Sequence, residues 1–192
     1  FFSRPSEAMS VAGITGTNGK TTTAWLVTQA IVRLGGSAGY VGTLGHGLNG
    51  QLRAGELTTP DCISFHRQLR ELADEGATHV VAEVSSHALD QERVAGVRFT
   101  TVAFTNLTRD HLDYHPDLAA YGAAKARLFA LGAGTAVINL DDPFGRELAG
   151  RLPAGTRLLG VTLAGAPGAP PAGADAAPTP DALRVGERGG GG

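Results

Sequence analysis

The sequence predicts an α/β fold: a phosphate-loop-containing, three-layer domain with a mostly parallel central sheet and helices on both faces. Short apolar runs alternate along the chain with segments of helical periodicity, which is the order found in parallel α/β sheets. Val80–Ala82 and Val102–Phe104 are apolar at consecutive positions, which is typical of strands covered on both sides. A glycine-containing loop, Gly16–Thr21, joins the first apolar run to the first helical segment.

The elements follow one another in a regular order. An apolar strand leads through the glycine loop into a helix, and further apolar runs and helix-period segments follow. The expected strands are Ser10–Thr15, Ser37–Val41, His79–Val84, Thr100–Thr105 and Thr135–Asn139. The expected helices are Thr22–Leu34, Cys62–Glu75, Asp117–Leu131 and Pro143–Gly150. Parallel sheets bind ligands beyond the carboxyl ends of their strands, and the loop, Glu83–His87 and Asn106–Asp113 are all expected there.

Composition limits the class of protein. The 192 residues suffice for one well-buried domain and are few for two. A net charge of −2 gives no electrostatic reason to expect nucleic acid or an anionic membrane as a partner. Cys62 is the only cysteine, so no internal disulfide can form, which fits a reducing cytoplasm. No apolar stretch approaches the roughly 20 residues of a membrane span. We therefore expect a cytoplasmic monomer.

The composition also divides the chain. Residues 1–163 are expected to form the domain, which we interpret as incomplete at its carboxyl end. Residues 164–192 form an Ala/Gly/Pro-rich, low-complexity tail that cannot bury enough apolar surface to fold alone. Because the chain begins at Phe1 rather than at methionine, we interpret it as a piece of a longer protein.

The glycine loop is the main functional signal. Its glycines allow backbone N–H groups to point at phosphate oxygens, and the helix N-terminus adds partial positive charge. Lys20 can reach the terminal phosphates and the Thr21 hydroxyl can ligate Mg²⁺. The strict pattern G-x-x-x-x-G-K-[ST] requires glycine at position 14, where this chain has Ile14, so the loop is a variant; a purely structural turn is the alternative. The predicted nucleotide-binding residues are Gly16, Thr17, Asn18, Gly19, Lys20, Thr21 and Thr22.

Polar residues after the third strand form a second candidate cluster. Glu83 ends an apolar strand, where a carboxylate can hold Mg²⁺ beside a nucleotide; the alternative is a carboxylate that faces solvent. Ser85, Ser86 and His87 follow, but a Ser–His nucleophile is disfavoured because neighbours on a strand point to opposite faces. Substrate or metal-shell hydrogen bonding is the better interpretation, with a helix cap at Ser86 as the alternative.

Three further residues are ambiguous from their local pattern. His111 and His115 are four residues apart and could share a helix face, but without the Glu of H-E-x-x-H zinc hydrolysis is not expected. Lys125 lies among small and apolar residues of an expected helix, where it can extend to solvent as a snorkelling lysine. Asp142 precedes a proline and can be either a helix cap or a nucleotide-side contact.

Taken together, these motifs resemble the central ATP-binding domain of the Mur ligases, most closely the MurE branch of UDP-N-acetylmuramoyl-L-alanyl-D-glutamate ligases (UDP-N-acetylmuramyl-tripeptide synthetases). They occur in family order over about residues 8–160. The matching segments are Gly16–Thr22, Leu57–Asp61, Glu83–Leu89, Phe104–His115, Ala123–Lys125 and Asn139–Pro143.

The resemblance implies an ATP-dependent amide-bond ligase of peptidoglycan synthesis, which adds the third amino acid, diaminopimelate or lysine, to UDP-MurNAc-L-Ala-D-Glu through an acyl phosphate. It implies that Thr21 and Glu83 hold one Mg²⁺ and that His111 lies at a second. Lys125 matches the family's carbamylated lysine, whose carbamate supplies an oxygen ligand for Mg²⁺. The catalytic residues implied are Lys20, Glu83, His111 and Lys125. The residues implied to grip the dipeptide substrate are Thr58, Thr59, Ser85, Gln91 and Arg93.

The family also has an N-terminal domain for the uridine moiety and a C-terminal domain that closes over ATP and binds the added amino acid. We expect neither in this chain, so that alone it is expected to be inactive. Three alternatives stay open: a folylpolyglutamate or cyanophycin synthetase domain, a GTPase switch, which the lack of an Asn-Lys-x-Asp motif disfavours, and a non-catalytic phosphate-loop module.

Overall fold

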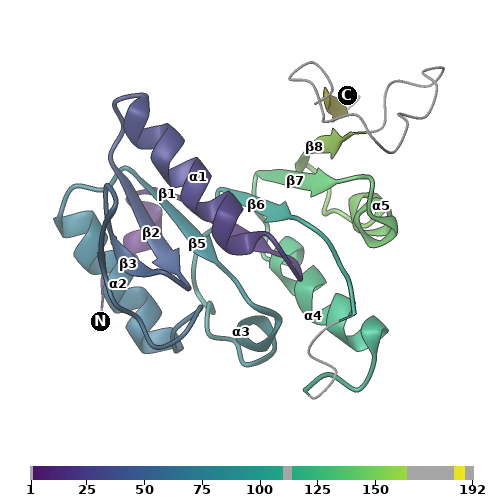
Figure 1. Cartoon of the computed structure of the whole chain (residues 1–192), viewed down its shortest axis with the longest axis horizontal. Coiled ribbons are helices and arrows are strands. Elements are labelled where there is room, and N and C mark those ends of the chain that lie inside the picture. Colours follow the sequence, from purple (N-terminus) through teal and green to yellow (C-terminus); the bar gives the residue numbers. More distant parts are fainter. Residues whose placement is uncertain (1, 110–113, 164–183, 189–192) are drawn as a thin grey trace, which may run out of the picture.

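A computed structural model describes residues 2–109, 114–163 and 184–188, and within these residues the chain forms a nine-stranded sheet flanked by helices (Figure 1). The strands are β1 (Ser10–Thr15), β2 (Ala38–Gly42), β3 (Gly45–Leu48), β4 (Gln51–Arg53), β5 (His79–Glu83), β6 (Thr101–Phe104), β7 (Thr135–Asn139), β8 (Arg157–Thr162) and β9 (Arg184–Arg188). The helices are the 3₁₀ turn η1 (Pro5–Glu7) and α1 (Lys20–Arg33), α2 (Cys62–Asp74), α3 (Ser86–Asp90), α4 (Leu118–Ala130) and α5 (Pro143–Gly150).

The sheet is parallel at its centre and antiparallel at its ends. Its strand order is β4-β3-β2-β5-β1-β6-β7-β8-β9. The pairs from β2 through β8 are parallel, whereas β3, β4 and β9 pair antiparallel with their neighbours. In register, Ile14 lies beside Glu83, and Thr15 lies beside Phe104. The loops that follow β1, β5 and β6 therefore leave from one edge of the sheet.

Two apolar clusters separate the three layers. The larger cluster packs α2, α4 and α5 against one face of the sheet through residues such as Phe65, Leu128 and Leu148. The smaller cluster packs α1 against the other face, where Ala24 of the helix meets Ile14 and Tyr40. Figure 1 shows α1 crossing the sheet, with α2 and α4 lying beyond its other side. Burial of β-branched strand residues against both layers explains their continuous apolarity.

The predicted fold class and the main elements are confirmed. All five expected strands and all four expected helices are present, and no end differs from the expected one by more than two residues. For example, α1 begins at Lys20 rather than Thr22, because the backbone is already helical directly after Gly19. An α/β fold of this kind places the predicted polar segments at one edge.

Several elements were not predicted. The β3–β4 hairpin turns at Asn49 and Gly50, which both have positive φ, and Asn-Gly is a strong hairpin signal that could have revealed it. The one-turn helix α3 is too short for periodicity to show. Strand β8 lies within the predicted domain, and β9 lies within residues 164–192, where no strand was expected; β9 pairs with β8. The division at residue 163 stays a prediction.

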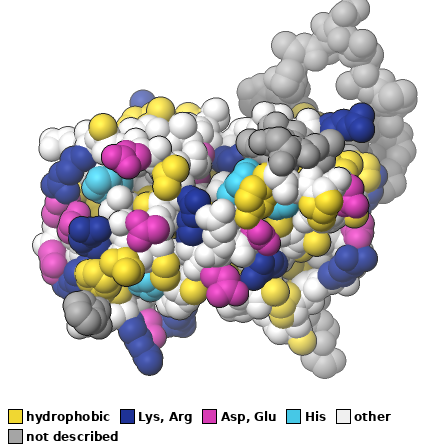
Figure 2. All heavy atoms as spheres, turned by 90° about the horizontal axis from the view of Figure 1, so that it is seen from below, with side chains coloured by type: hydrophobic (Ala, Val, Ile, Leu, Met, Phe, Trp, Pro, Cys, Tyr) yellow, Lys and Arg dark blue, Asp and Glu magenta, His cyan; other side chains and the backbone are white. Residues whose placement is uncertain are grey.

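The surface carries mixed charges. Figure 2 shows acidic and basic side chains interspersed with apolar ones over the face drawn there. In the part of the chain that the structure describes, no helix combines the length and apolarity needed to cross a bilayer.

Candidate nucleotide and substrate site

The glycine loop, Gly16–Thr21, is called the phosphate loop from here on. It starts where β1 ends. Ile14, which replaces the glycine of the strict pattern, is buried in β1 against α1, so the turn begins only at Gly16. Gly16 and Gly19 have φ of 148° and 82°, and a Cβ at Gly16 would clash with the Thr105 hydroxyl. Both positions therefore require glycine. The loop therefore departs from the strict pattern by a turn that begins later, at Gly16, and the turn itself is kept.

The loop after β6 supports the phosphate loop. The backbone N–H of Thr17 donates to the carbonyl of Asn106 at 2.8 Å, and the N–H of Asn18 donates to its side-chain oxygen at 3.0 Å. The Thr105 hydroxyl donates to the Asn18 carbonyl at 2.7 Å, and the Thr108 N–H donates to the Thr17 hydroxyl at 3.0 Å. These contacts fix the shape of the turn before any ligand arrives.

Lys20 points back into the loop. Its Nζ donates to the carbonyls of Gly16 at 2.9 Å and Thr17 at 2.8 Å. The amine thus lies inside the turn. From there it can exchange these carbonyl acceptors for the phosphate oxygens of a bound nucleotide. Lys20 and Thr21 also begin α1, so their backbone lies at the positive end of the helix dipole.

Glu83 is the centre of the polar cluster. It is 0% exposed, so the alternative of a solvent-facing carboxylate is wrong. Its Oε2 accepts from the Thr21 hydroxyl at 2.8 Å and from the Thr43 hydroxyl at 3.3 Å. Its Oε1 accepts from the Thr43 N–H at 2.9 Å and from the hydroxyl of Tyr40. Burial, and next the hydrogen bond to Glu83, raise the pKa of Tyr40, so it stays a donor.

The residues present fit a magnesium ion. Thr21 and Glu83 place a hydroxyl and a carboxylate side by side at the start of α1, and Mg²⁺ prefers such oxygen ligands together with waters and substrate phosphates. Among the described residues, no three His, Cys, Asp or Glu side chains form a group that could hold a metal ion. His111 lies outside the described residues.

Lys125 reaches the same loop from α4. It is 1% exposed, its Nζ donates to the Gly16 carbonyl at 2.8 Å and lies 4.1 Å from the centre of the Tyr121 ring. The interpretation of a snorkelling lysine is therefore wrong. Tertiary packing places this amine directly beneath the phosphate loop, a position that the helical pattern alone could not show.

The predicted substrate residues lie beside Glu83. The hydroxyls of Thr58 and Thr43 are 3.0 Å apart. Buried Thr59 donates from its hydroxyl to the Glu83 carbonyl at 2.9 Å and accepts from the Ser85 N–H at 3.1 Å. The structure therefore ties Thr59 and Ser85 to the main chain of Glu83, and Thr58 to Thr43, which itself contacts the carboxylate.

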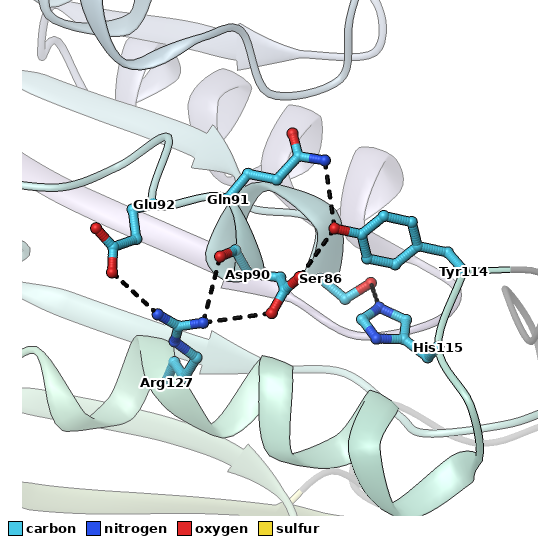
Figure 3. Close-up of polar contacts among 7 residues, drawn as sticks. All are labelled: Ser86, Asp90, Gln91, Glu92, Tyr114, His115 and Arg127. Carbon is cyan, nitrogen blue, oxygen red and sulfur yellow. Dashed lines mark hydrogen bonds and ion pairs between the residues drawn. The ribbon is translucent and has the colours of Figure 1, made fainter.

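Gln91 and Arg93 complete this group (Figure 3 shows Gln91). Nη1 of Arg93 donates to the Thr59 carbonyl at 2.9 Å, and its Nη2 donates to the Gln91 side chain at 2.6 Å. Arg93 thus links Gln91 to the main chain of Thr59, and the Thr59 hydroxyl in turn contacts the main chain of Glu83. Thr59 and Arg93, which are 34 positions apart, meet here although their segments follow β4 and β5, two strands that are not neighbours in the sheet.

The serine–histidine segment is arranged differently from expectation. Ser85, not Ser86, caps α3: its hydroxyl accepts from the Ala88 N–H at 3.1 Å. Ser86 Oγ instead lies 3.0 Å from Nε2 of His115, and the two residues are 1% and 5% exposed. Their burial leaves no room for a substrate, so this pair is structural. His115 precedes α4 and does not lie in a helix.

Asp142 is a helix cap. One carboxylate oxygen accepts from the N–H groups of Phe144 and Gly145, and the other accepts from the Leu107 N–H at 2.7 Å. The cap alternative is therefore confirmed, and the same side chain also ties α5 to the loop after β6.

Sequence reasoning missed four residues of the site. Tyr40 and Thr43 hold the carboxylate of Glu83, and Thr43 could have been found because it directly follows a strand at the ligand-binding edge. Tyr114 and Arg127 contact the turn that carries Gln91. No local signal marks Arg127, which lies on a helix.

Comparison with known proteins agrees with this geometry. The profile of the Mur ligase middle domain matches residues 14–163. The chain belongs to the Mur ligase family. The predicted family is thereby confirmed, as is its resemblance to the MurE branch. Over 182 residues the chain is 52% identical to the UDP-N-acetylmuramoyl-L-alanyl-D-glutamate–2,6-diaminopimelate ligase of Alkalilimnicola ehrlichii, covering 94% of this chain and 36% of the relative.

Sequence identity and TM-score are higher for ligases of this name than for a folylpolyglutamate synthase. The enzyme of the same name from Xylella fastidiosa is 54% identical over 166 residues, 86% of this chain and 34% of the relative. A solved structure of such a ligase is 37% identical with a TM-score of 0.74, covering 82% of this chain and 32% of that one. Folylpolyglutamate synthase of Mycobacterium tuberculosis reaches a TM-score of 0.61 at 18% identity, covering 75% and 40%, and shares the fold alone. This chain spans about a third of the length of its relatives.

Proposed function

We propose that this Mur ligase middle domain acts, within a longer ligase, in the ATP-dependent addition of diaminopimelate to UDP-MurNAc-L-Ala-D-Glu. The observation that carries the proposal is the single cluster formed by Lys20, Thr21, Glu83 and Lys125 with the substrate residues around Thr59. Relatives that are more than 50% identical bear the name of that ligase. The amino acid added, the nucleotide and the cytoplasmic location belong to the proposal.

Each part of the cluster has a role in phosphoryl transfer. The backbone N–H groups after Gly16 and the Lys20 amine bind the β- and γ-phosphates of ATP. Thr21 and Glu83 would hold Mg²⁺, which supplies charge neutralisation at the transferring phosphoryl group. Arg93, Gln91, Thr58, Thr59 and Ser85 orient the dipeptide so that its terminal carboxylate oxygen attacks the γ-phosphorus and ADP departs. The amine of the added amino acid then attacks the acyl phosphate and displaces phosphate.

We further propose that Lys125 carries a carbamate in the working site and that His111 lies at a second Mg²⁺. The neutral Lys125 amine adds to the carbon of CO₂ and loses a proton, which gives an anionic oxygen ligand. The buried position beside Gly16 supports this role, because an ammonium there would repel the metal.

The carbamate can be detected without activity. Lys20 and Lys125 are the only lysines of the sequence, so a ¹³C carbamate signal from labelled bicarbonate has two possible lysine sources. We expect that Lys125→Ala abolishes the signal and that the matched variant Lys20→Ala keeps it. A signal that survives in Lys125→Ala contradicts the assignment.

The ligase function is tested by grafting. The matching segment of the A. ehrlichii ligase is replaced with residues 14–163 of this chain, and product is measured by mass spectrometry with UDP-MurNAc-L-Ala-D-Glu, ATP and diaminopimelate. We expect the tripeptide product from the chimera and none when the graft carries Lys20→Ala. A folded chimera that forms no product, beside an active unmodified relative, would refute the proposed function.

A further inference from the structure

We propose that Tyr114 is a positioning residue: its hydroxyl, held by Asp90, fixes the side-chain amide of Gln91 so that Gln91 and Arg93 face the dipeptide substrate. The inference rests on the proposed function for the identity of that substrate. It adds a residue, Tyr114, that touches neither the phosphate loop nor Glu83 within the described part of the chain.

The amide of Gln91 is held at both ends (Figure 3 shows the Tyr114 end). Its oxygen accepts from Nε of Arg93 at 3.0 Å and from Nη2 at 2.6 Å. Its nitrogen donates to the Tyr114 hydroxyl at 3.3 Å. A side-chain amide can rotate by half a turn and exchange its donor and acceptor ends. The two contacts select one orientation, because only the oxygen can accept from a guanidinium.

Tyr114 is itself fixed. Its hydroxyl donates to Oδ2 of Asp90 at 2.8 Å, so it has its lone pairs available to Gln91. Its ring lies 4.0 Å from the centre of the His87 ring and 4.8 Å from that of His115. The hydroxyl therefore serves as an acceptor of defined position rather than a freely rotating group.

Helix α4 anchors the turn from the other side. Nη1 of Arg127 lies 3.4 Å from Asp90 Oδ1, and its Nη2 lies 3.3 Å from Glu92 Oε1 (Figure 3). These acidic residues flank Gln91, and Glu92 has a left-handed backbone with φ of 55°. Arg127 thus holds both sides of a tight turn, two residues beyond the Lys125 that contacts the phosphate loop. One helix thereby places the substrate turn relative to the nucleotide loop.

Tyr114, Arg127 and Asp90 are partly exposed, so their effect on the position of Gln91 can be measured separately from any effect on the stability of the fold. Tyr114 is 39% exposed, and the side chains of Arg127 and Asp90 are 44% and 48% exposed. Exposed ion pairs contribute little to folding. Removing the Tyr114 hydroxyl should therefore leave the fold intact while it frees the Gln91 amide.

The experiment uses the ¹⁵N-labelled 192-residue chain and its Tyr114→Phe variant. In Tyr114→Phe we expect the two side-chain amide signals of Gln91 to change in chemical shift. Their line widths should decrease to those typical of a mobile glutamine side chain. The dissociation constant for UDP-MurNAc-L-Ala-D-Glu is measured by calorimetry on the chimera in which residues 14–163 of this chain replace the matching segment of the A. ehrlichii ligase. In Tyr114→Phe it should rise by about 2- to 12-fold, the loss of one hydrogen bond. Binding of ADP and the melting temperature should stay unchanged.

Three further variants define the cause. In a Gln91→Ala background, Tyr114→Phe should add no further loss of substrate affinity, because the hydroxyl acts through Gln91. Arg127→Gln should weaken substrate binding in the same direction as Tyr114→Phe. The matched control is Arg151→Gln, since Arg151 is an exposed arginine that pairs with Glu147 at 2.7 Å on α5, and it should bind as the parent does.

The outcomes are distinct. Unchanged Gln91 signals in Tyr114→Phe, or an equal loss of affinity in the Gln91→Ala background, would overturn the positioning role while the ligase function stands. Failure of the chimera to bind the uridine nucleotide beside an unmodified relative that binds it, with Gln91 signals that still respond to Tyr114→Phe, would count against the proposed substrate and not against the coupling of Tyr114 to Gln91.

Discussion

Glu83 shows how much of this site depends on single side chains. Within the described residues, its carboxylate accepts from Thr21, Tyr40 and both donors of Thr43 while it is completely buried. A buried carboxylate is tolerated only when its lone pairs have donors. The same donors aim it at the place where a phosphate-bound cation would lie.

Tyr40→Phe should lower the free energy of unfolding by about 1.5–3 kcal/mol, because it removes one donor from a buried, charged acceptor. Urea unfolding of the two proteins measures the difference. The ring and its edge contact with Trp25 remain in the variant, so lost packing does not contribute. A variant as stable as the parent would show that the hydroxyl does not stabilise Glu83.

Lys20→Ala should weaken binding of Mg²⁺–ATP by about 10- to 150-fold, since a charge-assisted phosphate contact contributes roughly 1.5–3 kcal/mol. Calorimetric titration of the chain provides the measurement. Arg33→Ala, at the other end of α1, is the control and should bind ATP as the parent does. Equal affinities for Lys20→Ala and the parent would remove the phosphate role.

At the scale of elements, helix caps distinguish the ligand-binding helix from the others. Helices α2, α3, α4 and α5 each begin with a side chain that accepts from their first turn, and these caps are Asp61, Ser85, Asp117 and Asp142. Helix α1 instead has Gly19 at its N-cap position, and glycine has no side chain that could cap it. This is also the helix that follows the glycine loop, so the positive end of its dipole faces the place where phosphate would bind.

The cap of α2 should make stability depend on pH. Hydrogen bonds from the Ser64 hydroxyl and N–H lower the pKa of Asp61 below its usual value of 3.8. The stabilisation is therefore complete above that value and is lost as the pH falls through the lowered one. Asp61→Asn keeps a capping oxygen but does not titrate. The difference in melting temperature between the parent and Asp61→Asn should therefore shift against the parent as the pH falls below 3.8, and should be constant above that pH. A difference that does not change below pH 3.8 would contradict the prediction.

At the scale of the whole molecule, the chain corresponds to about a third of the length of the ligases that it resembles. The chain spans 36% of the A. ehrlichii ligase, and amide formation requires two substrates and ATP to be positioned together. We predict that the isolated chain forms no tripeptide product with UDP-MurNAc-L-Ala-D-Glu, ATP and diaminopimelate, as measured by mass spectrometry. Turnover by the isolated chain would show that these residues suffice for catalysis.

The sequence by itself determined the fold class, the phosphate loop and the edge of the sheet at which the site forms. These follow from local patterns: strand apolarity, helical period and the glycines before Lys20. Periodicity could not reveal β3, β4 and α3, because such short elements are set by turns and by pairing with neighbours. The sequence also could not decide between the two interpretations of Lys125, Ser86 or Asp142, because both interpretations fit the local pattern.

Only the tertiary structure decided which side chains act on one another. Tyr40 reaches Glu83 across 43 positions of sequence, Lys125 reaches Gly16 across 109, and Tyr114 reaches Gln91 across 23. Contacts of this range arise where parallel strands lie side by side and their loops leave from a common edge, so no sequence window contains both partners. Burial was also visible only in the tertiary structure. The helical pattern places the Lys125 amine on the surface, whereas in the folded chain it is buried against the phosphate loop.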